Sequence, residues 1–163
     1  MRRELRGSMA FDASVLVELL LSTPAGRLVR DRLLEGELFG YATELAVVEA
    51  EYVLCGQLGW EEAEAKVEAL VRSGFIQVED ITPLCERAAK YKCERALALP
   101  DCFTIALAEM LFIPALFARR EHELVKELGR APPGVEVLFL EDFLAGAGPS
   151  NRDPSALAQR REK

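Results

Sequence analysis

Short apolar runs separated by longer segments with helical spacing dominate the pattern of hydrophobic and polar positions along the chain. The runs at 9–12, 75–81, 114–118 and 135–140 predict strands, and 38–39 is a weaker candidate between Gly36 and Gly40. Helices are predicted over residues 15–20, 25–34, 43–58, 61–72, 83–97, 101–111 and 119–128. Apolar strands that alternate with helices are typical of a parallel sheet covered on both faces. We therefore expect an α/β fold, a three-layer α/β/α domain with a central parallel sheet of four to five short strands.

The chain of 163 residues is long enough for one domain with its own hydrophobic core. Residues 9–145 carry the predicted elements, and residues 1–8 look like a loose N-terminal extension. Turn formers and charges dominate residues 146–163, which predicts a disordered tail. No apolar run reaches the length of a membrane span, and Asp12 and Glu18 interrupt the only stretch that resembles a signal peptide. We expect a cytoplasmic protein that does not enter a membrane.

Charge and cysteine content exclude some classes of function. A formal net charge of −7 is the wrong sign for a passive nucleic-acid coat, although acids at a metal site would leave a nuclease possible. The four cysteines form no CxxC pair and His122 is the single histidine, which argues against a structural zinc site. We expect reduced cysteines in the core, or a disulfide if the source is a hyperthermophile.

Two aspartates occupy equivalent places at the starts of predicted helices. Asp12 ends the first strand and precedes an apolar helix, and Asp101 follows Pro100 at the start of another. Each can be a helix N-cap, because Asp is favoured there. Each can also bind a hard cation, because ligands of parallel α/β sheets bind at the carboxyl ends of strands.

Glutamates in the long helix over residues 43–58 interrupt apolar surroundings. The helical neighbours of Glu49 are Leu45, Tyr52 and Val53, and Glu51 has similarly apolar neighbours. A buried carboxylate needs a cation or a hydrogen-bond donor nearby. Periodicity does not choose between the two glutamates.

Four segments together resemble the PIN-domain family, which includes the VapC-like toxins. They are FDASVLVELL, LAVVEAEYVL, ALPDCFTIALAEML and PALFARREHEL, within roughly residues 9–143. The resemblance implies that Asp12, Glu49 and Asp101 are the first three acids of the site, and it favours Glu49 over Glu51 and Glu44.

The fourth acidic position departs from the family pattern. The resemblance places Arg120 where the family has an aspartate, and Glu121 follows one residue later. Glu121 is either the replacement for that acid or a solvated residue in the first turn of a polar helix. Loss of the fourth acid would weaken a second metal position most.

The resemblance implies an endoribonuclease that uses Mg²⁺ or Mn²⁺. Asp12 and Asp101 would bind the ion directly, and Glu49 would bind it or hold a water molecule beside it. It also implies a cognate antitoxin and a homodimer, and Leu16, Leu19, Leu20 and Leu21 belong either to a dimer surface or to the core. Candidates for RNA phosphate contacts are Arg27, Arg30, Lys90, Lys92, Arg95, Arg119 and Arg120, whereas His122 is expected at the surface.

Two other functions compete with the nuclease. A PIN-fold module that binds RNA or protein with weak or no catalysis fits the displaced fourth acid. A phosphoacceptor domain that uses Asp12 would want an adjacent acidic pair and a lysine after a late strand, and neither is evident.

Overall fold

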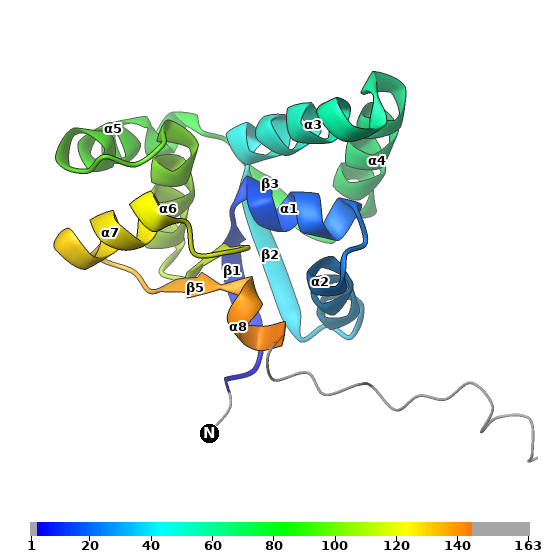
Figure 1. The fold of residues 1–163 in the computed structure, drawn as a ribbon, viewed down its shortest axis with the longest axis horizontal. Coiled ribbons are helices and arrows are strands. Elements are labelled where there is room, and N and C mark those ends of the chain that lie inside the picture. The colour runs from blue at the N-terminus through cyan, green and yellow to red at the C-terminus, as the bar shows by residue number, and fades with distance from the viewer. Residues whose placement is uncertain (1–2, 145–163) are drawn as a thin grey trace, which may run out of the picture.

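Five short parallel strands form the centre of the computed structural model, which describes residues 3–144 (Figure 1). They are β1 (Gly7–Phe11), β2 (Leu38–Thr43), β3 (Ile76–Glu79), β4 (Ala115–Phe117) and β5 (Val137–Phe139), in the order β3-β2-β1-β4-β5. The prediction of a parallel sheet in a three-layer α/β/α domain is confirmed. The tail predicted for residues 146–163 lies outside the described residues.

Helices follow the strands in the alternation that the sequence predicts. They are α1 (Ala13–Leu20), α2 (Pro24–Leu34), α3 (Glu44–Leu58), α4 (Trp60–Ser73), α5 (Cys85–Glu94), α6 (Leu99–Leu111), α7 (His122–Arg130) and α8 (Leu140–Leu144), with a 3₁₀ turn, η1 (Thr82–Leu84), before α5. Figure 1 shows α1 and α2 on one side of the sheet and α5, α6 and α7 on the other. Helices α3 and α4 form a hairpin that begins where β2 ends.

Alternating side chains of the strands bury two separate cores. Met9 and Phe11 of β1 pack with Leu116 under α1 and α2, whereas Ala10 packs with Phe117 under α5 and α6. Successive side chains of a strand point to opposite faces, so a strand covered on both sides is apolar at nearly every position. This explains why the strands appear in the sequence as continuous apolar runs.

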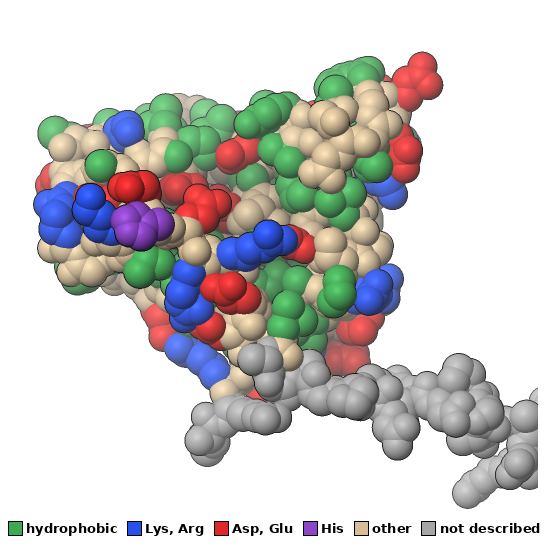
Figure 2. All heavy atoms as spheres, viewed as in Figure 1, with side chains coloured by type: hydrophobic (Ala, Val, Ile, Leu, Met, Phe, Trp, Pro, Cys, Tyr) green, Lys and Arg blue, Asp and Glu red, His purple; other side chains and the backbone are tan. Residues whose placement is uncertain are grey.

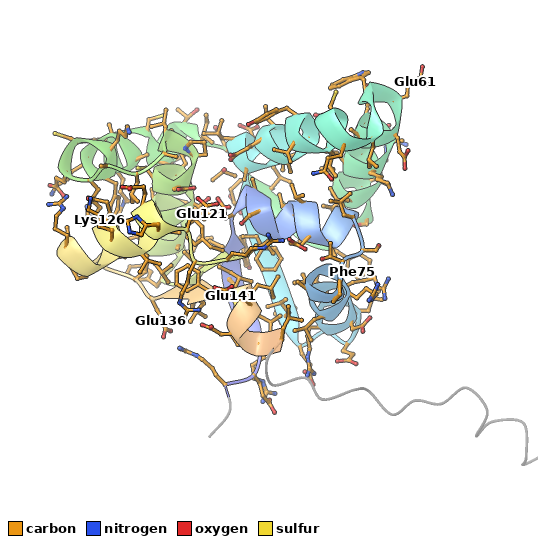
Figure 3. The ribbon with its side chains drawn as sticks, viewed as in Figure 1. Glu61, Phe75, Glu121, Lys126, Glu136 and Glu141 are labelled. Atoms are coloured by element: carbon orange, nitrogen blue, oxygen red, sulfur yellow. The ribbon has the colours of Figure 1, made fainter. Side chains whose placement is uncertain are left out.

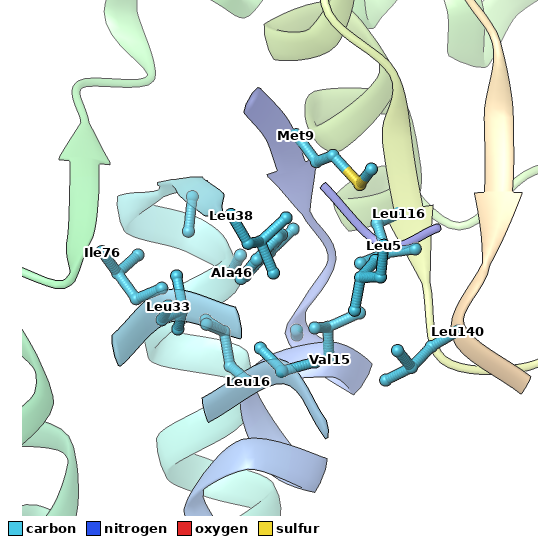
Figure 4. Packing of buried hydrophobic residues seen from close by; sticks show 14 of the residues in the cluster. Leu5, Met9, Val15, Leu16, Leu33, Leu38, Ala46, Ile76, Leu116 and Leu140 are labelled. Atoms are coloured by element: carbon cyan, nitrogen blue, oxygen red, sulfur yellow. The ribbon is translucent and has the colours of Figure 1, made fainter. Parts of the chain in front are cut away.

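The first strand begins earlier than predicted. Gly7 pairs with Leu38 of β2, and Leu5 is 2% exposed within the core beneath α1 and α2 (Figure 4). The prediction that residues 1–8 are a loose extension is therefore wrong for residues 5–8, because burial of the Leu5 side chain holds this segment against the sheet.

Gly40 lies inside β2 rather than at its boundary. A Cβ atom at this position would lie 2.7 Å from Phe11 Cε2 and 2.7 Å from Ile76 Cδ1. The glycine therefore allows the side chains of the two neighbouring strands to cover the backbone of β2. The sequence suggested a break here, because glycine usually marks one.

The leucines of α1 pack within the monomer. Leu16 belongs to the core, Leu19 packs against it, and Leu20 and Leu21 pack against Leu54 and its neighbours in the α3–α4 hairpin. Core packing buries Leu16 fully, whereas Leu19, Leu20 and Leu21 remain half-buried. Within residues 3–144, no helix combines the length and apolarity that crossing a membrane requires.

All four cysteines are free. Cys102 is buried in the core as expected, but Cys85 and Cys93 are exposed and Cys55 is half-buried. The prediction that the cysteines fill the core is therefore wrong for Cys85 and Cys93, the two on α5.

Candidate active site

The strand order of the sheet reverses between β1 and β4, and Asp12 lies at this switch point. Strands β2 and β3 follow β1 on one side, and β4 and β5 lie on the other. The backbone N–H of Asp12 donates to the Leu116 carbonyl at 2.9 Å, so the residue is tied to the end of β4. A change of strand order opens a crevice at the carboxyl edge, where ligands of such sheets bind.

Asp12 combines a capping role with an unpartnered oxygen. Its Oδ2 accepts a hydrogen bond from the Ser14 N–H at 3.0 Å, which confirms the predicted N-cap of α1. Its Oδ1 is buried and has no hydrogen-bond partner, although the residue is only 7% exposed. Burial raises the pKa of Asp12, the bonds from Ser14 oppose the rise, and the charge of Glu121 adds to it. A buried carboxylate oxygen of this kind calls for a cation or a donor.

Glu49 approaches Asp12 from α3. Thr43 ends β2 and caps the helix, with its Oγ1 accepting from the Ala46 N–H at 3.0 Å. The half-buried Glu49 follows on this helix, and burial, then the charge of Asp12, then that of Glu121 raise its pKa. Glu44 at the start of the same helix is exposed.

Asp101 lies in the first turn of α6 but is not its cap. Ala98 occupies the cap position, so the N-cap interpretation of Asp101 is wrong. The carboxyl group is free for other partners, and it faces the other acids. Burial first, and then the charges of the other three, raise the pKa of Asp101 to about 7. A shift of this size is typical of functional sites.

Glu121 is the fourth member of the group. It stands at the exposed start of α7, and its charge raises the pKa of each of the other three acids. Figure 3 shows Glu121 beside the start of α1, among other carboxylate oxygens, and Figure 2 shows acidic side chains gathered at the centre of this face. The structure therefore brings together all four predicted site residues, which come from four different elements.

The four carboxylates do not already form a closed ligand set. Within the described range, 3–144, no three His, Cys, Asp or Glu side chains are gathered tightly enough to hold a metal ion as they stand. Mutual repulsion favours such spacing, since like charges raise each other's pKa when they approach. The donors are nevertheless carboxylate oxygens, which suit Mg²⁺ or Mn²⁺ better than softer metals. The buried Asp12 Oδ1, which accepts no hydrogen bond, fits a bound cation of this kind.

Two residues that support the site were not predicted. Ser14 Oγ accepts a hydrogen bond from the Ala118 N–H at 3.0 Å, which joins the start of α1 to the end of β4. Glu18 is buried in α1 and accepts from Arg119 at 2.8 Å. The only sequence signal was an acid and a serine within an apolar stretch, and neither signal identifies a partner more than 100 residues away.

Two of the basic residues predicted to contact RNA, Lys92 and Arg95, donate to backbone carbonyls of the protein itself. The Arg95 side chain is 8% exposed, donates to the Ala131 carbonyl at 2.8 Å and stacks over the Tyr91 ring. Lys92 donates to the Leu97 carbonyl at 2.6 Å. Arg95 is therefore structural, and its proposed phosphate contact is wrong. His122 is exposed, as predicted.

The model of the PIN-domain family matches residues 9–128, which is most of the chain and contains all four acids. The chain belongs to the PIN-domain family. No curated protein matches the sequence. This PIN domain has the strand order 3-2-1-4-5, whereas flavodoxin-like phosphoacceptor folds have 2-1-3-4-5, so the phosphoacceptor alternative is excluded.

Solved structures with the same fold include three from the VapC group. VapC20 from Mycobacterium tuberculosis, a Sarcin-Ricin loop cleaving toxin, is 20% identical with a TM-score of 0.54, over 66% of this chain and 86% of that one. VapBC2 from Rickettsia felis is 12% identical with a TM-score of 0.61, over 81% and 97% of the respective chains. VapBC-1 from nontypeable Haemophilus influenzae is 15% identical with a TM-score of 0.58, over 83% and 99%. At these identities the likeness concerns the fold.

Proposed function

We propose that this PIN domain is an endoribonuclease that depends on Mg²⁺ or Mn²⁺ and hydrolyses RNA phosphodiester bonds. The observation that carries the proposal is the buried, unpartnered Asp12 Oδ1 at the switch point of the sheet, surrounded by the charges of three other acids. Structural acids usually have donors of their own, and Asp12 has one for only half of its carboxylate.

The four carboxylates have different roles in this proposal. Asp12 and Asp101 would hold the ion, Glu49 would join them or orient a water molecule, and Glu121 would supply the fourth carboxylate. A bound ion would neutralise these charges and stabilise the charge that develops on a phosphodiester. In the free protein Asp101 can hold a proton near neutral pH, because its pKa is about 7. That proton must leave before the ion binds.

Cleavage of RNA in Mn²⁺ by wild type and by Asp12→Asn tests the proposal. Asparagine also caps helices, so this variant keeps the bond to Ser14 and is expected to fold. Cleavage should fall by at least about a hundredfold, which corresponds to about 3 kcal/mol of transition-state stabilisation. Asp31→Asn, the same substitution at an exposed position of α2, should leave cleavage unchanged. Equal cleavage by Asp12→Asn and wild type would remove the proposed function.

Glu49 and Glu51 offer a second comparison on one helix. Glu49→Gln should reduce cleavage, because Glu49 lies close enough to Asp12 for the charge of Asp12 to raise its pKa. Glu51→Gln should not, because Glu51 is absent from the charges that act on Asp12, Glu49 and Asp101. If Glu51→Gln reduced cleavage and Glu49→Gln did not, Glu51 would be the glutamate of α3 that belongs to the site.

We further propose that the protein is the cytoplasmic toxin of a VapBC-type pair, with a cognate antitoxin and a homodimeric state. The support is the shared fold with VapBC complexes. A protein encoded beside this chain, when added at equal concentration, should suppress cleavage, and light scattering should give twice the chain mass. Undiminished cleavage would contradict the antitoxin, and a monomeric mass would contradict the dimer.

One alternative has an observation in its favour. A PIN-fold binding module with weak or no catalysis would explain why Arg120 takes the fourth family position and why residues 3–144 contain no closed ligand set. A Mn²⁺ titration distinguishes it from the nuclease. Binding that Asp12→Asn abolishes supports the nuclease, and equal behaviour of the two proteins supports the module.

A further inference from the structure

The turn between β4 and α7 is fastened to the start of α8. The Arg120 N–H donates to Glu141 Oε1 at 2.9 Å, and the Glu141 N–H donates to the Ala118 carbonyl at 3.1 Å. Two reciprocal bonds therefore hold residues 118–120 against the chain that follows β5. This explains why α7 begins at His122, three residues later than the sequence predicts.

The Arg120 side chain is held on the same side. Its Nη2 donates to Asp142 Oδ2 at 2.6 Å, its Nη1 donates to Glu141 Oε1 at 3.3 Å, and its guanidinium stacks 4.5 Å from the centre of the Phe139 ring. A paired and stacked arginine of this kind is fixed in direction, which lysine does not reproduce. The Arg120 side chain is thus held by residues of β5 and α8 and does not extend into the acidic site.

Glu121 points the other way because of the backbone between them. Its φ of −87° and ψ of 139° are extended. Successive side chains of an extended chain lie on opposite sides. With Arg120 fixed on α8, Glu121 is directed towards Asp12 and Asp101, whose pKa values its charge raises. Figure 3 shows Glu121 and Glu141 on opposite sides of this turn.

We propose that Arg120 is a positioning residue that presents Glu121 to the acidic site as the fourth carboxylate. The inference rests on the proposed metal-dependent function. An acid at position 120 would point at Glu141 and Asp142, so in this chain the fourth acid follows one residue later, at position 121.

A double-mutant cycle on Mn²⁺ affinity tests this role without RNA. Mn²⁺ binding is measured by electron paramagnetic resonance for wild type, Arg120→Gln, Glu121→Gln and the double variant. Loss of an outer residue that orients a ligand typically weakens metal affinity tenfold or more, so Arg120→Gln should bind Mn²⁺ about tenfold more weakly. Glu121→Gln, which removes the carboxylate itself, should bind at least as weakly as Arg120→Gln. The double variant should bind no more weakly than Glu121→Gln, because Arg120 acts through Glu121.

Further variants separate positioning from a general loss of folding. Asp142→Ala removes the two oxygens that accept from the Arg120 guanidinium and should weaken Mn²⁺ binding as Arg120→Gln does. Arg72→Gln, which removes an exposed arginine of α4, should change nothing. Urea unfolding confirms that each protein is folded during the titration.

The Mn²⁺ affinities of these variants test the role of Arg120 and the metal site separately. Additive effects of Arg120→Gln and Glu121→Gln would overturn the positioning role. Unchanged affinity of Glu121→Gln, with binding still lost in Asp12→Asn, would overturn it and leave the nuclease proposal intact. Absence of Mn²⁺ binding in wild type would overturn both.

Discussion

Glu18 and Arg119 form an ion pair at 2.8 Å although 101 residues separate them in the chain. The Glu18 side chain is 11% exposed and that of Arg119 is 72% exposed, so the two partners are unequal. Glu18 also accepts a hydrogen bond from the Thr23 hydroxyl, which in turn caps α2. One carboxylate thereby joins α1, the start of α2 and the turn after β4, beside the acidic site.

The difference in burial between Glu18 and Arg119 predicts that replacing each by alanine lowers the free energy of unfolding by a different amount. Glu18→Ala should lower the free energy of unfolding by about 2–3 kcal/mol, because a buried hydrogen-bonded carboxylate is lost and the Thr23 hydroxyl keeps only its longer bond to the Glu18 backbone carbonyl. Arg119→Ala should cost about 1 kcal/mol or less, because exposed guanidinium groups contribute little. Urea denaturation of both variants measures the difference. Equal costs would contradict the assignment of Glu18 as the anchor.

The pKa of Asp101 predicts an unusual dependence of stability on pH. Its value of about 7 in the folded protein exceeds the ordinary 3.8, so between these values the folded state binds more protons than the unfolded state. The free energy of unfolding therefore falls as pH rises through this window. Asp101→Asn should remove that loss and raise the free energy of unfolding at pH 8 by about 1–3 kcal/mol.

Chemical denaturation in EDTA at pH 5 and pH 8 provides the measurement. Asp31→Asn, at an exposed site, serves as the control and should follow wild type at both values. A variant that is less stable than wild type at pH 8 would show that Asp101 is a favourable structural charge.

Divalent ions should stabilise the wild-type fold. At a concentration of Mn²⁺ a hundred times its Kd, the free energy of unfolding should rise by about 2.7 kcal/mol, and Tm by about 5–10 °C. The effect should be smaller at pH 5, because a proton on Asp101 competes with the ion. Thermal unfolding followed by circular dichroism records it. If Asp12→Asn responds to Mn²⁺ as wild type does, the ion binds elsewhere.

Two glycines make a matched pair for testing the packing of the sheet. Gly40→Ala in β2 should destabilise the protein by about 1–3 kcal/mol, because the added Cβ meets Phe11 and Ile76. Gly56→Ala in α3 should instead stabilise it by about 0.5–1 kcal/mol, because nothing lies within 4 Å of its Cβ and alanine favours helix. Opposite shifts of the urea midpoint are expected. Shifts of the same sign would contradict this account of Gly40.

Local signals in the chain were sufficient for the parallel α/β architecture. Alternation of apolar strands with helices, the caps at Asp12 and Thr23, and the apolar surroundings of Glu49 all act within a few residues. Such preferences survive folding, since a helix end satisfies its free backbone groups with nearby side chains and a strand covered on both faces is apolar along its length. The resemblance of four short segments to PIN domains then indicated which acids to compare.

Contacts between distant segments decided the features of the fold and the site that local signals did not predict. Leu5 and Gly40 took their places because side chains from other strands pack against them, and neither position carries a local signal for this. The pKa of Asp101 and the opposite directions of Arg120 and Glu121 arise from charges and acceptors far away in the chain. Burial and electrostatic fields depend on distances in space, which only the folded sheet with its helices establishes.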